Sequence, residues 1–148
     1  TDHCPFKISQ KNSGKTDFTK IPNGLGGVEH RIEFLYSEGV AKGRLTLERL
    51  VEVTSEMPAK LFGIFPKKGT LTTGSDADIV ILDPSSMHTI SHSSHQSNCD
   101  YSPYEGLSVR GRIDTTILRG NIAVRNGTLS GKPGSGRFLK RKKYFAPQ

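Results

Sequence analysis

The hydrophobic pattern of this chain changes from a helical period to a strand period near Pro66, and this change limits the possible folds more than any other feature. Before it, Val28, Ile32 and Leu35 recur at intervals of four and three, which predicts a helix over residues 28–36. After it, short apolar runs alternate with turn residues. Helices followed by strands are typical of one α+β domain, or of the last helices of one domain followed by the strands of another.

A second helix is expected to begin after Thr46, a residue type that often caps helix N-termini. Pro58 is expected to end that helix and to open a third one, since proline fits the first turn of a helix but not its interior. In the third helix, Leu61 and Phe62 would face inward. The buried stripe of the second helix would consist of Leu47, Leu50, Val51 and Thr54.

The strand region is predicted from one apolar run and two turns. Residues 79–82 are continuously apolar, which is typical of a strand covered on both faces. Residues 85–114 are rich in serine and histidine and are expected to form a loop. Gly120 with Asn121, and Asn126 with Gly127, supply the positive φ angles of tight hairpins, which predicts a strand meander.

The net charge of +7 is concentrated at the end of the 148-residue sequence. A nucleic-acid site should spread its charge over a face or interleave it with aromatic residues, so we do not expect nucleic acid as a partner. We interpret residues 131–148 as a basic tail that packs through Phe138 and Leu139, with polyanion binding or a localisation signal as the alternatives. The charges that form this run are Arg137, Lys140, Arg141, Lys142 and Lys143.

The chain carries two cysteines and no apolar stretch near the roughly 18 residues that a membrane-spanning helix needs. We therefore expect reduced thiols at Cys4 and Cys99, no membrane partner and a cytoplasmic location. No basic-then-apolar leader opens the sequence. The first residues, Thr1-Asp2-His3, already offer potential chemistry, so we expect the chain to be the downstream part of something longer.

Three groups of side chains could carry chemistry. Asp2 and His3 could bind a metal or transfer a proton, although a surface or capping role explains such a pair as well. A second group is spaced like a metal cluster, but its serine-rich segment is a poor helix former, which favours a polar loop. That group consists of His88, His92, His95 and Cys99. Asp76, Asp78 and Asp83 flank the apolar strand and are expected to serve as caps and turn residues.

Several long strings, in order and with matching spacing, resemble the hydantoinase/dihydropyrimidinase family of cyclic amidohydrolases. The strings cover nearly the whole chain and are chemically arbitrary, so the signal is specific. They are TDHCPF (1–6), DFTKIPNG (17–24), GVEHR (27–31), LVEVTSE (50–56), PAKLFG (58–63), KGTL (68–71), GSDADIVI (74–81), DYSPYEG (100–106) and GSGRFLK (134–140).

The resemblance implies a mixed α/β fold in two parts. Residues 1–67 would form the end of a metal-dependent (β/α)₈ barrel, with its last strand end and closing helices. Residues 68–130 would supply strands and a loop of a β-sandwich, and residues 131–148 the tail. The family forms homotetramers, so a homo-oligomer is expected for the full-length protein.

The resemblance also implies zinc-dependent hydrolysis of a small cyclic amide or imide, such as a dihydropyrimidine or a 5-substituted hydantoin, to an N-carbamoyl amino acid. Asp2 matches the aspartate that binds a metal and acts as general base and then acid, and Asn23, in the loop of Pro22 and Gly24, matches a residue whose main chain contacts the substrate ring. Some relatives carry that asparagine three positions later, where this chain has Gly26. The family uses two zinc ions and a carbamylated lysine, and that lysine is not in this chain, so the isolated chain is expected to be inactive. The alternative is a non-catalytic assembly protein of the collapsin response mediator type, whose counterpart of Asp2 is missing.

Overall fold

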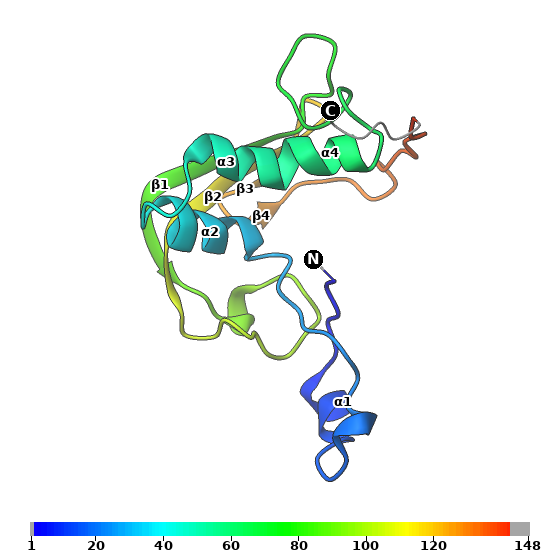
Figure 1. Ribbon diagram of the computed structural model, residues 1–148, viewed down its shortest axis with the longest axis vertical. Helices are drawn as coiled ribbons and strands as arrows, with labels where there is room; N and C mark the ends of the chain where they lie inside the picture. Colours follow the sequence, from blue (N-terminus) through cyan, green and yellow to red (C-terminus); the bar gives the residue numbers. More distant parts are fainter. Residues whose placement is uncertain (1, 143–148) are drawn as a thin grey trace.

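The structure, a computed structural model, describes residues 2–142. Figure 1 shows a layer of helices lying along a twisted antiparallel sheet, with an arm that carries α1 (Ile8–Asn12) extending away from both. The sheet holds four strands in the order β1-β2-β3-β4. The architecture is mixed α/β, as expected. No helix of the described chain is long and apolar enough to cross a membrane.

The first predicted helix is displaced towards the C-terminus. α2 (Arg31–Leu35) continues directly into a π-helical turn, Tyr36–Val40, so the helix begins three residues later than predicted and ends four residues later. Residues 28–30 form a turn instead, after Gly27 with its φ of 154°. The hydrophobic spacing therefore located the helix correctly but not its ends.

The second and third predicted helices are one continuous helix. α3 (Leu47–Val51), a π-helical turn (Glu52–Glu56) and α4 (Met57–Leu61) follow one another without a break. Thr46 caps it as expected, because its Oγ1 accepts the Arg49 N–H at 3.2 Å. The predicted end at Pro58 is wrong.

The helix passes Pro58 because a wide turn precedes it. The Met57 N–H bonds to the carbonyl of Glu52, five residues back, and such a turn relieves the clash between a proline ring and the preceding carbonyls. The expected burial is only partly correct: Leu50 is buried, whereas Leu47 and Val51 are exposed. Leu61 and Phe62, expected to face inward, are also exposed.

The sheet is larger than the sequence indicated. β1 (Ile79–Thr89) and β2 (Ser108–Leu118) pair antiparallel, so residues 85–89 and 108–114 of the predicted 85–114 loop are strands. Polar residues are tolerated in β1 because it is an edge strand, and a register shift between Asp83 and Met87 takes up Pro84. The predicted cover on both faces of residues 79–82 is wrong, since Val80 is 50% exposed and Ile81 48%.

Both predicted hairpins are present. β2 and β3 (Asn121–Arg125) are joined at Arg119 and Gly120, whose φ angles are 48° and 79°, one residue before the predicted turn. β3 and β4 (Thr128–Leu129) are joined at Asn126 and Gly127, as predicted, with φ angles of 49° and 74°.

Side chains of α2 and of the π-helical turn that follows it accept hydrogen bonds from the backbone of β2. Glu33 Oε1 accepts the Ile113 N–H at 2.9 Å, and Ser37 Oγ accepts the Arg110 N–H at 3.1 Å. These bonds and the close packing of Tyr36 on Gly111 fasten the helix layer to the sheet. The small apolar core consists of Leu50, Ala59, Ile90, Cys99 and Val109.

The basic tail does not pack as expected. Phe138 is 94% exposed, and only Leu139 is half-buried. The tail is held by its backbone instead, because the Lys142 N–H donates to the Gly63 carbonyl at 2.7 Å. Gly63 has a φ of 68°, and a Cβ there would overlap the Lys142 carbonyl, so the crossing requires glycine. Lys143, the last charge of the predicted run, lies outside the described residues.

Candidate functional site

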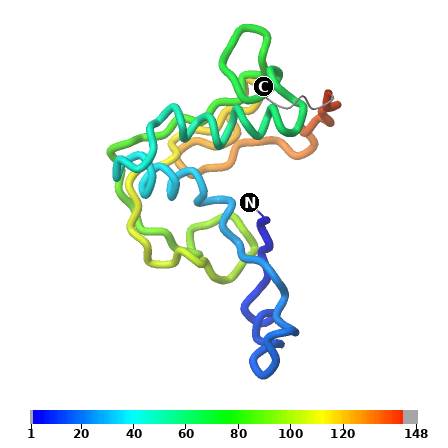
Figure 2. Tube along the Cα trace, viewed as in Figure 1, coloured from blue at the N-terminus to red at the C-terminus, as the bar shows by residue number. Residues whose placement is uncertain are grey.

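The structure brings the Asp2 segment beside the loop that contains Asn23. His3 forms a parallel bridge with Leu25, and the Cys4 N–H donates to the Leu25 carbonyl at 3.0 Å. Figure 2 shows the first residues running alongside the light-blue segment that follows residue 20. The two site residues predicted from sequence, Asp2 and Asn23, therefore lie on adjacent segments.

Asp2 is exposed and has a φ of 47°, in the left-handed region that non-glycine residues seldom adopt. Such backbone strain is often found at functional sites. Among residues 2–142, the only polar contact of its carboxylate is a weak one from the Cys4 thiol, with 3.8 Å between Sγ and Oδ1. The carboxylate is thus open to bind a metal or to accept a proton.

His3 has a positioning role. Its Nδ1 accepts the backbone N–H groups of Gly27 at 3.2 Å and Val28 at 3.4 Å. With that nitrogen occupied as an acceptor, the proton of the neutral ring sits on Nε2. His3 therefore joins the loop to the Asp2 segment.

Lys11 holds the other end of the loop. Its Nζ donates to the carbonyls of Pro22 and, at 2.6 Å, Gly24, the residues on either side of Asn23. The same ammonium lies 5.1 Å from the centre of the Phe6 ring. Lys11 could not be selected from sequence, because its acceptors are backbone carbonyls and these do not affect the spacing of side chains.

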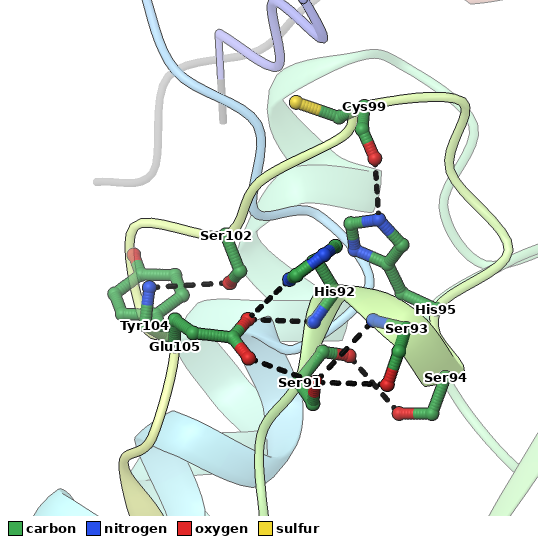
Figure 3. A network of polar contacts seen from close by, with 9 residues as sticks. All are labelled: Ser91, His92, Ser93, Ser94, His95, Cys99, Ser102, Tyr104 and Glu105. Carbon is green, nitrogen blue, oxygen red and sulfur yellow. Dashed lines mark hydrogen bonds and ion pairs between the residues drawn. The ribbon is translucent and has the colours of Figure 1, made fainter. Parts of the chain in front are cut away.

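The histidine-rich segment forms a polar loop, as interpreted from sequence, and Figure 3 shows its network. Glu105 accepts the His92 N–H at 2.7 Å and the Ser91 hydroxyl at 2.8 Å, and its other contact is to His92 Nδ1 at 3.0 Å. The backbone bond from His92, the Ser91 hydroxyl and the His92 ring lower the pKa of Glu105 to about 2. These hydrogen bonds hold the backbone of residues 91–94 in its turn.

The other members of the possible histidine–cysteine cluster point to separate partners. His95 Nε2 donates to the Cys99 carbonyl at 2.7 Å, and His88 Nε2 lies 3.1 Å from Glu33 Oε2, on the sheet. Cys4 and Cys99 are both free thiols, as expected.

Metal-binding side chains do not converge anywhere in the described range: no three or more His, Cys, Asp or Glu are placed to hold an ion. A catalytic zinc usually needs three protein ligands. Asp2 could supply one of them, so the residues present do not make a zinc site by themselves.

The aspartates around the apolar strand have structural roles, but only Asp83 has the turn role that was expected, whereas Asp76 and Asp78 form ion pairs with a lysine. Lys68 pairs with Asp76 at 2.9 Å and with Asp78, and Asp83 Oδ1 accepts the Ser85 N–H at 2.9 Å. Burial alone would lower the pKa of Lys68, but the hydrogen bonds to the two aspartates outweigh burial and raise it.

The amidohydrolase family matches residues 1–123. A D-phenylhydantoinase from Escherichia coli O1:K1 / APEC is 50% identical over 148 residues, covering 99% of this chain and 32% of the relative.

Solved structures of a dihydropyrimidinase and a D-hydantoinase have the same fold over the part that this chain matches. A dihydropyrimidinase from Brevibacillus agri NCHU1002 superposes with a TM-score of 0.96 at 49% identity, over 99% of this chain and 32% of that one. A D-hydantoinase from a Bacillus sp. AR9 gives 0.95 at 48% identity, over 98% and 32%. The chain thus spans about a third of the length of the proteins it matches.

Proposed function

This chain belongs to the amidohydrolase family, and we propose that it forms part of a zinc-dependent cyclic amidohydrolase acting on dihydropyrimidines or 5-substituted hydantoins. The names of its relatives, D-phenylhydantoinase, D-hydantoinase and dihydropyrimidinase, agree with the family resemblance read from the motifs. The observation that carries the proposal is Asp2, which has a left-handed backbone φ and an exposed carboxylate and whose segment lies beside the loop of Asn23.

The proposed reaction opens the ring by adding water to an amide carbonyl and breaking its C–N bond. Asp2 accepts the proton of the attacking water and then returns it to the departing ring nitrogen, which gives the N-carbamoyl amino acid. The Asp2 carboxylate is exposed, and its only polar contact among residues 2–142 is a weak one from the Cys4 thiol, so its oxygens are accessible to a substrate. Bound zinc would polarise the carbonyl.

The proposed substrate contact is made by the main chain of Asn23. In the part of the chain that the structure describes, neither its N–H nor its carbonyl forms a hydrogen bond. A ring amide presents one carbonyl and one N–H, so a free backbone donor and a free acceptor match its polar groups.

The proposed architecture follows from the fact that this chain spans about a third of the length of the proteins it matches. Residues 1–67 would close a (β/α)₈ barrel, residues 68–130 would contribute to a β-sandwich, and residues 131–148 would form the tail. Because a barrel typically takes about 250 residues, the remaining metal ligands would come from the part of the relatives that this chain does not match. The isolated chain is therefore proposed to be inactive, and the complete protein a cytoplasmic homotetramer.

A non-catalytic assembly protein of the collapsin response mediator type is the rival function. Retention of Asp2 favours the enzyme, because the assembly proteins that the motifs also resemble lack this aspartate.

A hybrid enzyme tests the proposal. It consists of the E. coli D-phenylhydantoinase with its matching segment replaced by these 148 residues, assayed with dihydrouracil and 5-phenylhydantoin beside the isolated chain. We expect zinc-dependent ring opening by the hybrid and none by the isolated chain. A folded, zinc-loaded hybrid that opens neither ring would contradict the proposed activity, and turnover by the isolated chain would contradict its dependence on the missing part.

A further inference from the structure

We propose that Lys11 is a positioning residue, which fixes the orientation of the Asn23 peptide group by holding the carbonyls on both sides of it. This inference rests on the proposed function of Asn23 as a substrate contact. Lys11 itself is not a catalytic residue, because it acts on the loop and not on the substrate.

Lys11 acts as a clamp, because its single ammonium group binds two carbonyls of the loop at once. One ammonium group donates to the Pro22 carbonyl and to the Gly24 carbonyl, and its remaining side faces the Phe6 ring. Hydrogen bonds from a charged donor are about twice as strong as neutral ones, and the half-buried position of Lys11 shields them from water.

The clamp is fixed to the rest of the fold. Lys11 lies on α1, whose first turn is closed by a bond from the Lys7 N–H to Gln10 Oε1 at 2.8 Å. The Ile8 N–H donates to Asp100 Oδ1, also at 2.8 Å, which ties α1 to the loop beyond residue 90. The ammonium is therefore presented from a short helix anchored at a distant point of the sequence.

Close packing at Gly24 also holds the backbone of the loop in place. Gly24 has a φ of 90°, and a Cβ there would lie 2.6 Å from the Cys4 Sγ, so the backbone packs directly on the Asp2 segment. The Pro22 and Gly24 carbonyls are both bonded to Lys11. In the described part of the chain, the N–H and the carbonyl of Asn23 form no hydrogen bond and remain free to bind a ligand. Loss of the ammonium would let the two carbonyls turn to solvent and the loop lose this orientation.

The test compares Lys11→Met, Lys11→Arg and Lys15→Met. Methionine keeps an unbranched stem but has no donor, arginine keeps the charge, and Lys15 is an exposed lysine of the same segment. Hydrogen exchange of the peptide covering residues 21–28, which includes the Gly27 and Val28 N–H groups bonded to His3, is measured in the hybrid enzyme, together with kcat and KM.

We expect Lys11→Met to speed exchange in this peptide about tenfold and to raise KM about tenfold with kcat within about twofold. This is less than the full strength of two charged hydrogen bonds, because water can replace the lost donor at the two carbonyls. Lys11→Arg should recover part of both effects, and Lys15→Met should match the parent. Unchanged exchange in Lys11→Met, or an unchanged KM in an active hybrid, would overturn the inference. An inactive parent hybrid would count against the proposed function, while exchange would still decide whether Lys11 holds the loop.

Discussion

Glu33 on α2 accepts a hydrogen bond from the backbone N–H of Ile113 on β2, with 2.9 Å between Oε1 and the nitrogen. The carboxylate is buried, and its other oxygen contacts the His88 ring on β1. One side chain of the helix therefore joins both long strands, close to the register shift between Ile81 and Leu82 where the β1–β2 pairing is irregular.

Replacing Glu33 should test how strongly this bond holds the two layers together. In Glu33→Ala the half-buried Ile113 N–H is left without an acceptor, which costs about 2 kcal/mol of unfolding free energy. Urea unfolding measures the loss. Glu33→Gln keeps a carbonyl oxygen for Ile113 and should retain most of the stability. Glu52→Ala, which removes an exposed ion pair with Arg49, should change stability by less than about 1 kcal/mol. Equal effects of the two alanine variants would contradict the role of Glu33.

The close packing of Tyr36 on Gly111 gives a second prediction. Gly111 has a φ of 92°, and a Cβ there would lie 2.4 Å from the Tyr36 Cδ1. Gly74 has the same φ with nothing within 4 Å, so it is a matched control for backbone strain alone.

Both alanine variants should lose roughly 1–2 kcal/mol from the left-handed φ. Gly111→Ala should lose roughly a further 1–3 kcal/mol, because the ring must move out of its site. Thermal unfolding of the two variants measures the difference. If they unfold at the same temperature, the ring contact contributes nothing.

The Glu105 network predicts a response to acid. Its ionised form is stabilised by the His92 N–H, the Ser91 hydroxyl and the His92 ring, which lower its pKa from 4.5 to about 2. A lowered folded-state pKa means that its contribution is complete above the unfolded value of 4.5 and is lost as the pH falls towards 2.

Hydrogen exchange at residues 91–94, corrected for the intrinsic effect of pH, should therefore rise between about pH 4.5 and 2. Glu105→Gln keeps the side chain's shape and should show the raised exchange already at neutral pH, with little further change in acid. A parent protein whose loop protection is flat across this range would contradict the assignment.

Local signals in the sequence predicted the parts of the fold that short-range chemistry decides. The Thr46 cap, the Asn126 turn and the presence of a strand at 79–82 depend on neighbouring residues only, and all three are present. The end of a helix at Pro58 was predicted by the same kind of rule and failed, because a π-helical turn before it relieves the clash. Burial was harder to predict, since Val80 and Phe62 lie on surfaces that these 148 residues leave uncovered.

The candidate site, too, could be predicted from the sequence only in part. Asp2 and Asn23 could be selected because they lie in long motifs of the family, and the structure places their segments side by side. The contacts that hold the site could not be predicted: His3 and Lys11 bind backbone groups, and the fold alone determines which backbone groups they meet.

The central claim is that Asp2 transfers the proton in hydrolysis of a cyclic amide, and an Asp2→Asn exchange in the hybrid enzyme tests it most directly. Asparagine has the same shape but cannot accept the proton, so kcat for ring opening should fall about a thousandfold, the usual scale for loss of a general base. Circular dichroism and thermal unfolding should match the parent, which separates lost chemistry from lost structure. Turnover that remains within about twofold of the parent enzyme would remove Asp2 from the mechanism and contradict the account.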